Sequence, residues 1–379
     1  MKTIGVLGAG QLARMLALAG IPLGFKFLYV DPSHSSPASW LGEQIVAPFE
    51  DATALQKLAD SSDLITYEFE NIPVSVVRKL AQTRSVFPPP IALESSQDRL
   101  LEKQFFNQHG IETAPFYPVD DQPSLEQTIA VLKLPLILKT RRLGYDGKGQ
   151  FLVKSLEDAI TAFNQLGQKG IIAEGFVQFD RELSCIAVRG IDGATFFYPL
   201  VENFHHDGIL RLSLAPAQVH ATDLNLQASA QVGRILQALD YVGILAVEFF
   251  EKEGRLIANE MAPRVHNSGH WTIEGAETSQ FENHIRAVAG LPLGDPKPRG
   301  FSAMINIIGS MPDASKVLKI PGAHLHDYGK EPRAGRKLGH LTIRADSLEE
   351  LNRTLRENLD LLPLETAKQW QNRLNRSKA

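Results

Sequence analysis

The chain has 379 residues, of which 44% are hydrophobic and 22% are charged, and its formal net charge is −4. This composition is typical of an ordinary globular protein, excludes a disordered or fibrous one, and at this length suggests two or three domains. The slight negative charge gives no general attraction to nucleic acid or to an anionic membrane, so we expect neither as a partner. The single cysteine, Cys185, excludes an internal disulfide and a cysteine-based zinc cluster, and we expect a buried thiol there.

Nothing along the chain predicts a targeting or membrane segment. Residues 1 to 32 contain several glycines and Arg14, so they lack the uninterrupted apolar core of a signal peptide. No uncharged run elsewhere approaches the roughly 20 residues that span a bilayer. We therefore expect a cytoplasmic protein.

The first elements predict a parallel sheet. "TIGVLG" (3 to 8) is a strand-like run that ends in glycine, and it is followed by the helix-like "QLARMLALAG" and by a second strand, "FKFLYVD". This order of strand, glycine turn, helix and strand is a βαβ unit. Similar alternation continues up to the prolines at 88 to 90. We predict an N-terminal Rossmann-like α/β domain over residues 1–95.

The middle of the chain predicts an α+β domain in two parts, about 96–170 and 171–295. A helix over 98–111 begins the first part, which also holds a glycine-rich loop. The second part is rich in strand-like runs joined by short turns, which indicate a largely antiparallel sheet. The proline- and glycine-rich stretch 290–300 predicts a boundary. A small C-terminal domain over 296–379 follows, with its final helix at 347–362.

The opening "GAGQL" has more than one interpretation. Gly8, Gly10 and Ala13 match the alanine form of the dinucleotide fingerprint, and Asp31 ends the next strand. The same residues suit a βαβ turn that needs small side chains for close packing. They also suit a helix N-terminus that holds a single phosphate.

A second glycine-rich stretch, "KTRRLGYDGKGQ" (139 to 150), follows a strand-like run. Lys139 ends the strand, and the loop then supplies Gly144, Gly147 and Gly149 together with Lys148. Glycines let backbone amides approach phosphate oxygens, and lysines add positive charge. The spacing is not that of a P-loop. A phosphate-binding loop and a solvated hairpin turn therefore both remain open.

Two acidic residues, Glu248 in "AVEFF" and Glu260 in "IANEMAP", occupy strand-like segments joined by the short turn "EKEG". Neighbouring antiparallel strands can direct both carboxylates into one cleft, where oxygen ligands suit a Mg²⁺ that bridges nucleotide phosphates. Asn259 alternates with Glu260 and would face away unless a bulge intervenes. The other interpretation is a surface carboxylate on each strand, but the apolar neighbours of Glu248 argue against it.

His266 and His270 lie four residues apart, a spacing that would suit a zinc site on a helix. The residues between them, 267 to 269, are poor helix formers. We therefore interpret the segment as a polar loop that continues the preceding strand and has no metal of its own. His270 is expected to brace this loop.

Six motifs, in the order of the chain, carry a family resemblance. They are "GQLARM", "TYEFENIP", "KTRRLGYDGKGQ", "NFHHDGILR", "NEMAPRVHNSGHWT" and "GRKLGH", which run from residue 10 to residue 340. With these motifs the chain resembles the ATP-grasp ligases and, among them, the N5-carboxyaminoimidazole ribonucleotide synthase family. The resemblance implies an ATP-grasp fold with a Rossmann-like N-terminal domain and a small C-terminal domain.

The resemblance also implies an activity and a set of ligands. The family carboxylates 5-aminoimidazole ribonucleotide with ATP and bicarbonate through carboxyphosphate, giving ADP, phosphate and N5-carboxyaminoimidazole ribonucleotide in purine synthesis. It uses Mg²⁺ and no biotin, and a homodimer is implied. Two alternatives are a formate-dependent ATP-grasp formyltransferase that makes formylglycinamide ribonucleotide, and a NAD-binding or nucleotide-sensing module. The stretch "HNSGHWT" favours the carboxylase, and a NAD module would leave Glu248 and Glu260 unused.

The resemblance assigns roles to particular residues. ATP would be surrounded by Arg99, Lys139, Gly144, Tyr145, Asp146, Gly147, Lys148, Gly149, Gln150, Glu174, Val177, Glu182, His205, Asn259 and Glu260. Mg²⁺ would be held by Glu248 and Glu260. The substrate phosphate would meet Gln11, Leu12, Lys330, Arg336 and Lys337. The residues near bicarbonate or the imidazole would be Tyr145, Asp146, Arg264, His266 and Asn267. The chain departs from the family pattern in two places. Ala9 and Ala13 stand where glycines are usual in the first loop, and Leu143 replaces a glycine before Gly144. Leucine restricts the backbone more than glycine does, so Leu143 bears on the flexibility of the 144–149 loop.

Overall fold

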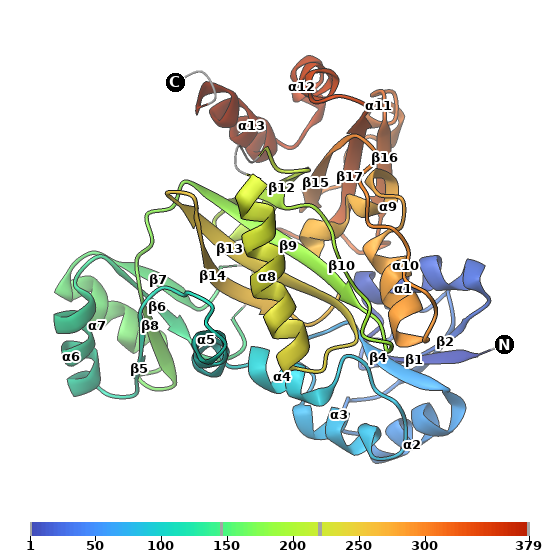
Figure 1. The fold of residues 1–379 in the computed structure, drawn as a ribbon, viewed down its shortest axis with the longest axis horizontal. Helices are drawn as coiled ribbons and strands as arrows, with labels where there is room; N and C mark the ends of the chain where they lie inside the picture. The colour runs from blue at the N-terminus through green and yellow to red at the C-terminus, as the bar shows by residue number, and fades with distance from the viewer. Residues whose placement is uncertain (1, 145–146, 219–221, 377–379) are drawn as a thin grey trace.

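The computed structural model describes residues 2–144, 147–218 and 222–376. In Figure 1 a long central sheet has the N-terminal part on one side, a small green lobe on another and the C-terminal helices above it. Within the described ranges, no helix combines the length and the apolar character required to cross a membrane.

The N-terminal part is an α/β layer, as the sequence predicts. Its elements are β1 (Thr3–Leu7), α1 (Gln11–Gly20), η1 (Ile21–Leu23), β2 (Lys26–Asp31), β3 (Glu43–Val46), α2 (Ala52–Ser61), β4 (Leu64–Tyr67) and α3 (Val74–Ala81). The strands lie in the order β3-β2-β1-β4 and are all parallel. Alternate residues of β1 face opposite sides, so Val6 packs with Leu16 of α1 and Leu7 packs with Leu58 of α2.

Two helices connect this layer to a small antiparallel lobe. The elements are α4 (Pro90–Ser96), α5 (Arg99–Gln108), β5 (Phe116–Val119), α6 (Gln122–Leu132), β6 (Leu136–Thr140), β7 (Gln150–Val153), α7 (Leu156–Gln165) and β8 (Ile171–Gly175). Asp98 caps α5 by accepting from the amide of Leu100, and its carboxylate also pairs with Arg141 at 2.8 Å. This cap joins the start of α5 to the segment that follows β6.

The central sheet carries most of the remaining chain. Its strands are β9 (Arg181–Arg189), β10 (Thr195–Phe197), β11 (Val201–His206), β12 (Ile209–Ala215), β13 (Gly243–Lys252), β14 (Arg255–Ala262), β15 (Phe301–Ile308), β16 (Ala323–Asp327) and β17 (Lys337–Ala345). They pair antiparallel in the order β14-β13-β9-β11-β12-β15-β17-β16, with β10 beside β9. The C-terminal strands therefore extend the sheet of the middle domain, because β15 pairs with β12.

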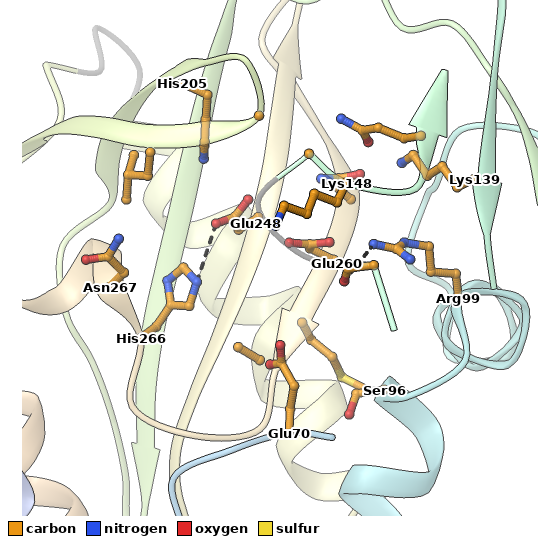
Figure 2. A pocket seen from close by; sticks show the side chains of 18 of the residues that line it. Glu70, Ser96, Arg99, Lys139, Lys148, His205, Glu248, Glu260, His266 and Asn267 are labelled. Carbon is orange, nitrogen blue, oxygen red and sulfur yellow. Dashed lines mark hydrogen bonds and ion pairs between the residues drawn. The ribbon is translucent and has the colours of Figure 1, made fainter. Parts of the chain in front are cut away.

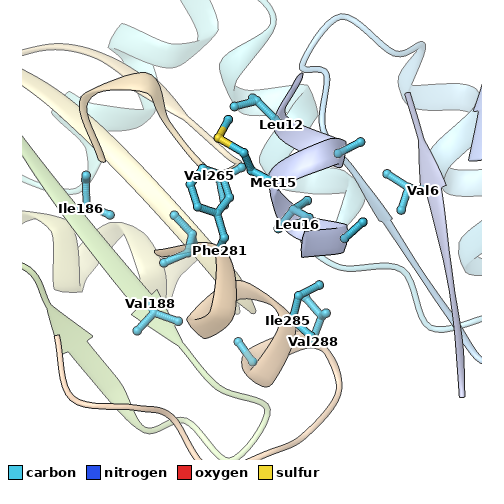
Figure 3. Close-up of a cluster of buried hydrophobic side chains, with 14 of the residues drawn as sticks. Val6, Leu12, Met15, Leu16, Ile186, Val188, Val265, Phe281, Ile285 and Val288 are labelled. Atoms are coloured by element: carbon cyan, nitrogen blue, oxygen red, sulfur yellow. The ribbon is translucent and has the colours of Figure 1, made fainter. Parts of the chain in front are cut away.

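Helices cover both faces of this sheet. They are α8 (Thr222–Ala238), η2 (Asn267–Gly269), α9 (Thr272–Gly275), α10 (Gln280–Val288), α11 (Ala314–Val317), α12 (Leu348–Glu357), η3 (Leu359–Leu361) and α13 (Leu364–Arg376). Helix α8 lies along one face (Figure 1) and buries Leu236 against Leu183 and Leu245. On the other face, Phe281 and Ile285 of α10 meet Leu16 of α1 (Figure 3). This contact fixes the N-terminus of α1 relative to the central sheet.

The predicted helix over 347–362 corresponds to α12, which ends at Glu357, and to the 3₁₀ turn η3. It is not the final helix, because α13 begins at Leu364. Pro363 separates η3 from α13, because proline disfavours helical backbone in the residue before it, and Leu362 is extended with φ −90° and ψ 154°. Trp370 then buries α13 against the sheet.

Candidate active site

A cavity of about 1500 Å³ lies where the central sheet, the small lobe and the N-terminal part meet. The residues predicted to bind ligands that line it are Gln11, Leu12, Arg99, Lys139, Gly144, Gly147, Lys148, Gln150, Glu174, Val177, Glu182, His205, Glu248, Asn259, Glu260, Arg264, His266, Asn267 and Lys337. Gly149, Lys330 and Arg336 do not line it. Tyr145 and Asp146 lie outside the residues that the structure describes.

Glu248 and Glu260, called the acidic pair below, lie opposite each other on β13 and β14 at the centre of the cavity (Figure 2). The pairing skips Asn259, because Phe249 pairs with Ala258, so a β-bulge places Asn259 at the cavity as well. Burial, opposed by His205 and assisted by Glu260, raises the pKa of Glu248 to about 7. A divalent cation would relieve this repulsion, and carboxylates are ligands that suit Mg²⁺, so the residues fit that ion.

His205 of β11 faces the acidic pair and is held by Glu182 of β9. Its Nδ1 lies 2.5 Å from a carboxylate oxygen of Glu182, and its carbonyl accepts from Gln369 of α13 at 3.1 Å. Burial lowers the pKa of His205, but the hydrogen bond and charge of Glu182, together with the acidic pair, outweigh burial and raise the pKa to about 9. The imidazole is therefore a cation at neutral pH.

The raised pKa of His205 predicts a pH dependence of stability. Because the pKa in the folded protein lies above its ordinary 6.5, the stabilisation is complete below about pH 6.5 and is lost as the pH rises through about 9. The difference in unfolding free energy between the unaltered chain and His205→Gln should shrink by on the order of 2 kcal/mol across that interval. Urea unfolding in metal-free buffer measures it, and a difference that stays constant from about pH 6 to pH 10 would contradict the assignment.

A buried group of charges supports the lobe side of the cavity. Lys139 and Lys103 approach the same oxygen of Glu174 at 2.9 Å and 3.3 Å, and Lys103 also donates to the carbonyl of Asn259 at 2.9 Å. Burial would raise the pKa of Glu174, but the two lysines lower it to about 2. The second carboxylate oxygen of Glu174 is buried without a hydrogen-bond partner, so it remains able to accept one from a ligand.

Sequence reasoning did not identify Lys103 or its neighbour Glu102. Glu102 is buried and accepts from the backbone amide of Met261 at 2.8 Å. A signal was present, because Arg99, Glu102 and Lys103 have the spacing of one helix face. Charged residues on the face of α5 that packs against β14 indicate a functional or supporting role.

The glycine-rich loop joins β6 to β7, which pair as an antiparallel hairpin. It is therefore a hairpin turn, and it also lines the cavity, so the two interpretations of this stretch are compatible. Arg99 donates to the carbonyls of Thr140 and Gly144 at 2.9 Å and 3.3 Å. Leu143 has a positive φ of 62° and is largely exposed, so it adopts the left-handed backbone that its glycine counterpart would favour.

Gly147 is the loop position most sensitive to a side chain. Its φ is +74°, and an added Cβ would lie 2.7 Å from the backbone oxygen of Asp207 across the cavity mouth. Gly147→Ala should lower kcat/KM for ATP by about tenfold or more, because the added methyl group must displace the loop from the Asp207 carbonyl, and a cost of about 1.4 kcal/mol corresponds to a tenfold loss. Gly167→Ala is the matched control, because its φ is +91° with nothing within 4 Å. An equal loss of kcat/KM in both variants would show that the contact with Asp207 is unimportant.

The segment after β14 forms a polar loop and not a long helix. A short 3₁₀ turn, η2, directly follows His266, whose Nε2 lies 3.5 Å from Glu248, and the short helix α9 begins only at Thr272. Arg264 pairs with Glu70 of the N-terminal part at 2.6 Å. Asn267 Nδ2 is buried without a hydrogen-bond partner and is free to donate to a ligand. Figure 2 shows His266 directed at Glu248 of the acidic pair.

Glu70 was not assigned a role from the sequence, although it belongs to the motif "TYEFENIP". His270, which was expected to brace the loop, packs against Phe281 and His340, with ring centroids 5.5 Å and 4.9 Å away.

The cavity also has an apolar wall that sequence reasoning missed, where the rings of Phe179 and Phe250 stack with centroids 4.7 Å apart.

At the far end of the cavity, the C-terminal domain meets α1. Lys330 Nζ donates to the side chain of Gln11 at 2.5 Å, although 319 residues separate the two. Burial, opposed by Glu68 and assisted by Arg336 and Lys337, lowers the pKa of Lys330 to about 8. Lys330, Arg336 and Lys337 thus form a basic cluster, and a bound anion would stabilise the protonated form of Lys330.

Glu68 changes the interpretation of the opening glycines. Its carboxylate accepts from the amides of Gly10 and Leu12 at 2.7 Å and 3.1 Å, and a Cβ on Gly10 would lie 2.4 Å from it. Asp31 likewise accepts from the Ala9 amide at 2.9 Å. Close packing therefore explains the small residues. The predicted donation of the Leu12 amide to a phosphate requires Glu68 to move, because that amide already has a partner.

Three models of known families match the chain. The Ribonucleotide synthetase preATP-grasp domain matches residues 1–97, the ATP-grasp domain matches residues 104–281, and the Phosphoribosylaminoimidazole carboxylase C-terminal domain matches residues 302–354. These matches confirm the ATP-grasp fold with its N-terminal and C-terminal domains. They do not test the residue boundaries, which stay predictions.

Individual relatives agree with the family models. N5-carboxyaminoimidazole ribonucleotide synthase of Pseudomonas aeruginosa is 52% identical over 341 residues, covering 90% of this chain and 94% of its own. The crystal structure of N5-carboxyaminoimidazole ribonucleotide synthetase from Thermus thermophilus is similar with a TM-score of 0.92 and 55% identity, over 95% of this chain and 98% of the other. That of N5-carboxyaminoimidazole synthase from Aspergillus clavatus, in complex with ADP and 5-aminoimidazole ribonucleotide, has a TM-score of 0.88 and 31% identity over 95% and 98%.

Proposed function

The chain belongs to the N5-carboxyaminoimidazole ribonucleotide synthase family of ATP-grasp enzymes, and from this premise we propose how its cavity acts. The protein is a carbon–nitrogen ligase of purine biosynthesis: it converts ATP, bicarbonate and 5-aminoimidazole ribonucleotide to N5-carboxyaminoimidazole ribonucleotide, ADP and phosphate. One observation carries the proposed binding sites. A single cavity is lined by the acidic pair, by the ion pair of Lys139 with Glu174, and by the basic residue Lys337.

ATP would occupy the side of the cavity formed by the small lobe. Its phosphates would meet Arg99, Lys139 and the loop that carries Lys148, while the apolar wall of Phe179 and Phe250 suits a purine ring. The acidic pair would hold Mg²⁺, which when bound supplies positive charge to the phosphate oxygens. Within the described residues, no group of three or more His, Cys, Asp or Glu side chains surrounds a metal position, so phosphate oxygens and water would complete its coordination.

Bicarbonate would lie in the polar loop after β14. Arg264, His266 and Asn267 all line the cavity and offer it a guanidinium, the Nε2 side of an imidazole and an unpartnered amide nitrogen as donors. A bicarbonate oxygen attacks the γ-phosphorus of ATP, the bond to the β-phosphate oxygen breaks, and ADP and carboxyphosphate form. Carboxyphosphate then separates into phosphate and CO₂, and the substrate amine forms the new N–C bond with loss of one proton. Water must be excluded from carboxyphosphate, and the glycine-rich loop, whose Gly144, Gly147 and Lys148 line the cavity, suits that role.

The phosphate of 5-aminoimidazole ribonucleotide would bind at the opposite end. Lys330, Arg336 and Lys337 supply positive charge there, and Gln11 stands at the N-terminus of α1. This placement leaves the imidazole amine beside Arg264 and the site of CO₂ release. A cytoplasmic location and a homodimeric assembly are further predictions that come from the family resemblance.

The release of ADP under defined omissions tests this function. ADP should form rapidly only when ATP, Mg²⁺, bicarbonate and 5-aminoimidazole ribonucleotide are all present. Turnover that requires formate and glycinamide ribonucleotide instead would assign the chain to the formyltransferases. Binding of NAD without binding of Mg-ATP would overturn the ligase assignment altogether.

A further inference from the structure

A continuous line of buried hydrogen bonds crosses the central sheet and ends at His266. Ser213 Oγ of β12 donates to Asn203 Oδ1 of β11 at 2.8 Å, and Asn203 Nδ2 donates to Ser184 Oγ of β9 at 3.0 Å. Ser184 Oγ donates to Ser268 Oγ at 2.8 Å, which lies 2.8 Å from His266 Nδ1. The three serines are fully buried, and Asn203 is 4% exposed.

The sheet pairing explains why these side chains form one row. Ser213 lies opposite Asn203, and Ser184 lies opposite Glu248. Their side chains therefore share the face of the sheet that carries the acidic pair. The row passes directly beside that pair without contributing a charge.

The direction of each hydrogen bond in the row is determined by its chemistry. An amide nitrogen can only donate, so the Asn203 Nδ2 makes Ser184 Oγ an acceptor, and the Ser184 proton points to Ser268. The Ser268 oxygen has a second lone pair, so its contact with His266 Nδ1 at 2.8 Å does not by itself give a direction. The backbone N–H of Ser268 decides it, because it donates to the same Nδ1 at 3.3 Å. Nδ1 is therefore unprotonated, the Ser268 proton points to it, and the proton of a neutral imidazole lies on Nε2.

We propose that Asn203, Ser184 and Ser268 are positioning residues that hold His266 in the tautomer with its proton on Nε2, directed toward Glu248 and the cavity. The inference deepens the proposed function, in which Nε2–H is a donor to bicarbonate or to the substrate. Because the backbone N–H and the hydroxyl of Ser268 both approach the Nδ1 lone pair, Nε2 is the ring nitrogen that can carry a proton into the cavity.

The tautomer can be measured without any turnover. We would record ¹⁵N NMR spectra of the full-length, histidine-labelled protein without nucleotide, and assign His266 from the signal that His266→Gln lacks. The expected result is a protonated Nε2 and an unprotonated Nδ1. Ser184→Ala should shift and broaden these signals toward a mixture of tautomers. The control Ser302→Ala removes another fully buried serine hydroxyl, one without a hydrogen-bond partner, and should leave them unchanged.

Kinetics then separates positioning from a general loss of structure. Ser184→Ala should lower kcat by about tenfold and leave KM for ATP unchanged. A loss of about tenfold is at the lower end of the effects seen when a residue that orients a functional side chain is removed. In the His266→Gln background the side-chain amide is a donor that has no tautomer, so Ser184→Ala should cause no further loss. An Nδ1–H tautomer in the unaltered protein, or an equal loss in both backgrounds, would overturn the proposal. If the enzyme instead lacked the proposed activity, the NMR result would still decide the tautomer.

Discussion

Glu260→Gln should lower kcat by on the order of 10³-fold while the protein remains folded, because charge supplied to transferring phosphoryl groups is worth several kcal/mol. Glutamine has the same shape as glutamate, but it removes the negative charge that Glu260 places opposite Glu248. The Mg²⁺ concentration needed for half-maximal activity should rise at the same time. Steady-state ADP release at several Mg²⁺ concentrations measures both effects.

Glu253→Gln is the matched control for this substitution. Glu253 is exposed in the turn of the same hairpin and does not line the cavity. It should retain full activity and the same Mg²⁺ dependence. If Glu260→Gln also retained full turnover, Glu260 would have no role in holding the metal.

Lys103→Met should cause the largest loss of stability among the substitutions considered. Lys103 is 1% exposed and its partner Glu174 is 4% exposed, so methionine leaves a buried carboxylate with one cationic neighbour in place of two. The carbonyl of Asn259 also loses its donor. Removing one partner of a buried ion pair costs about 3 kcal/mol, and urea unfolding in the absence of ligands measures the change.

An exposed pair provides the comparison for Lys103→Met. Lys57 and Glu43 are 54% and 63% exposed, and Lys57→Met should change the unfolding free energy by less than about 1 kcal/mol. The double variant Lys103→Met/Glu174→Gln should recover part of the loss, because it removes the stranded charge. A loss no greater than that of Lys57→Met would show that the buried lysine is not important for the fold.

Most of the fold could be predicted because its signals are local. Strand periodicity and short turns identified β13 and β14, and the condition stated for Asn259, a bulge in β14, is what the structure contains. The prediction of the last helix ended at Leu362, before Pro363, and therefore missed α13, which begins at Leu364. The family resemblance, and not periodicity, supplied the ATP-grasp assignment that the family models and relatives bear out.

The parts of the site that sequence reasoning missed depend on distant contacts. Lys103 matters because it reaches Glu174, and Glu68 matters because it fills the space above Gly10. The row that orders His266 joins neighbouring strands through Ser184, a residue type with no distinctive signal of its own. Spacing along the chain does not encode such pairings, since register and packing decide them.

The fate of the bicarbonate oxygens tests the central claim most directly. When [¹⁸O]bicarbonate, Mg-ATP and 5-aminoimidazole ribonucleotide are supplied together, one ¹⁸O atom should appear in each released inorganic phosphate, because the attacking oxygen stays on phosphorus when carboxyphosphate separates. Mass spectrometry of the phosphate measures this transfer. Phosphate that carries no ¹⁸O, while ADP is released at the full rate, would contradict the account.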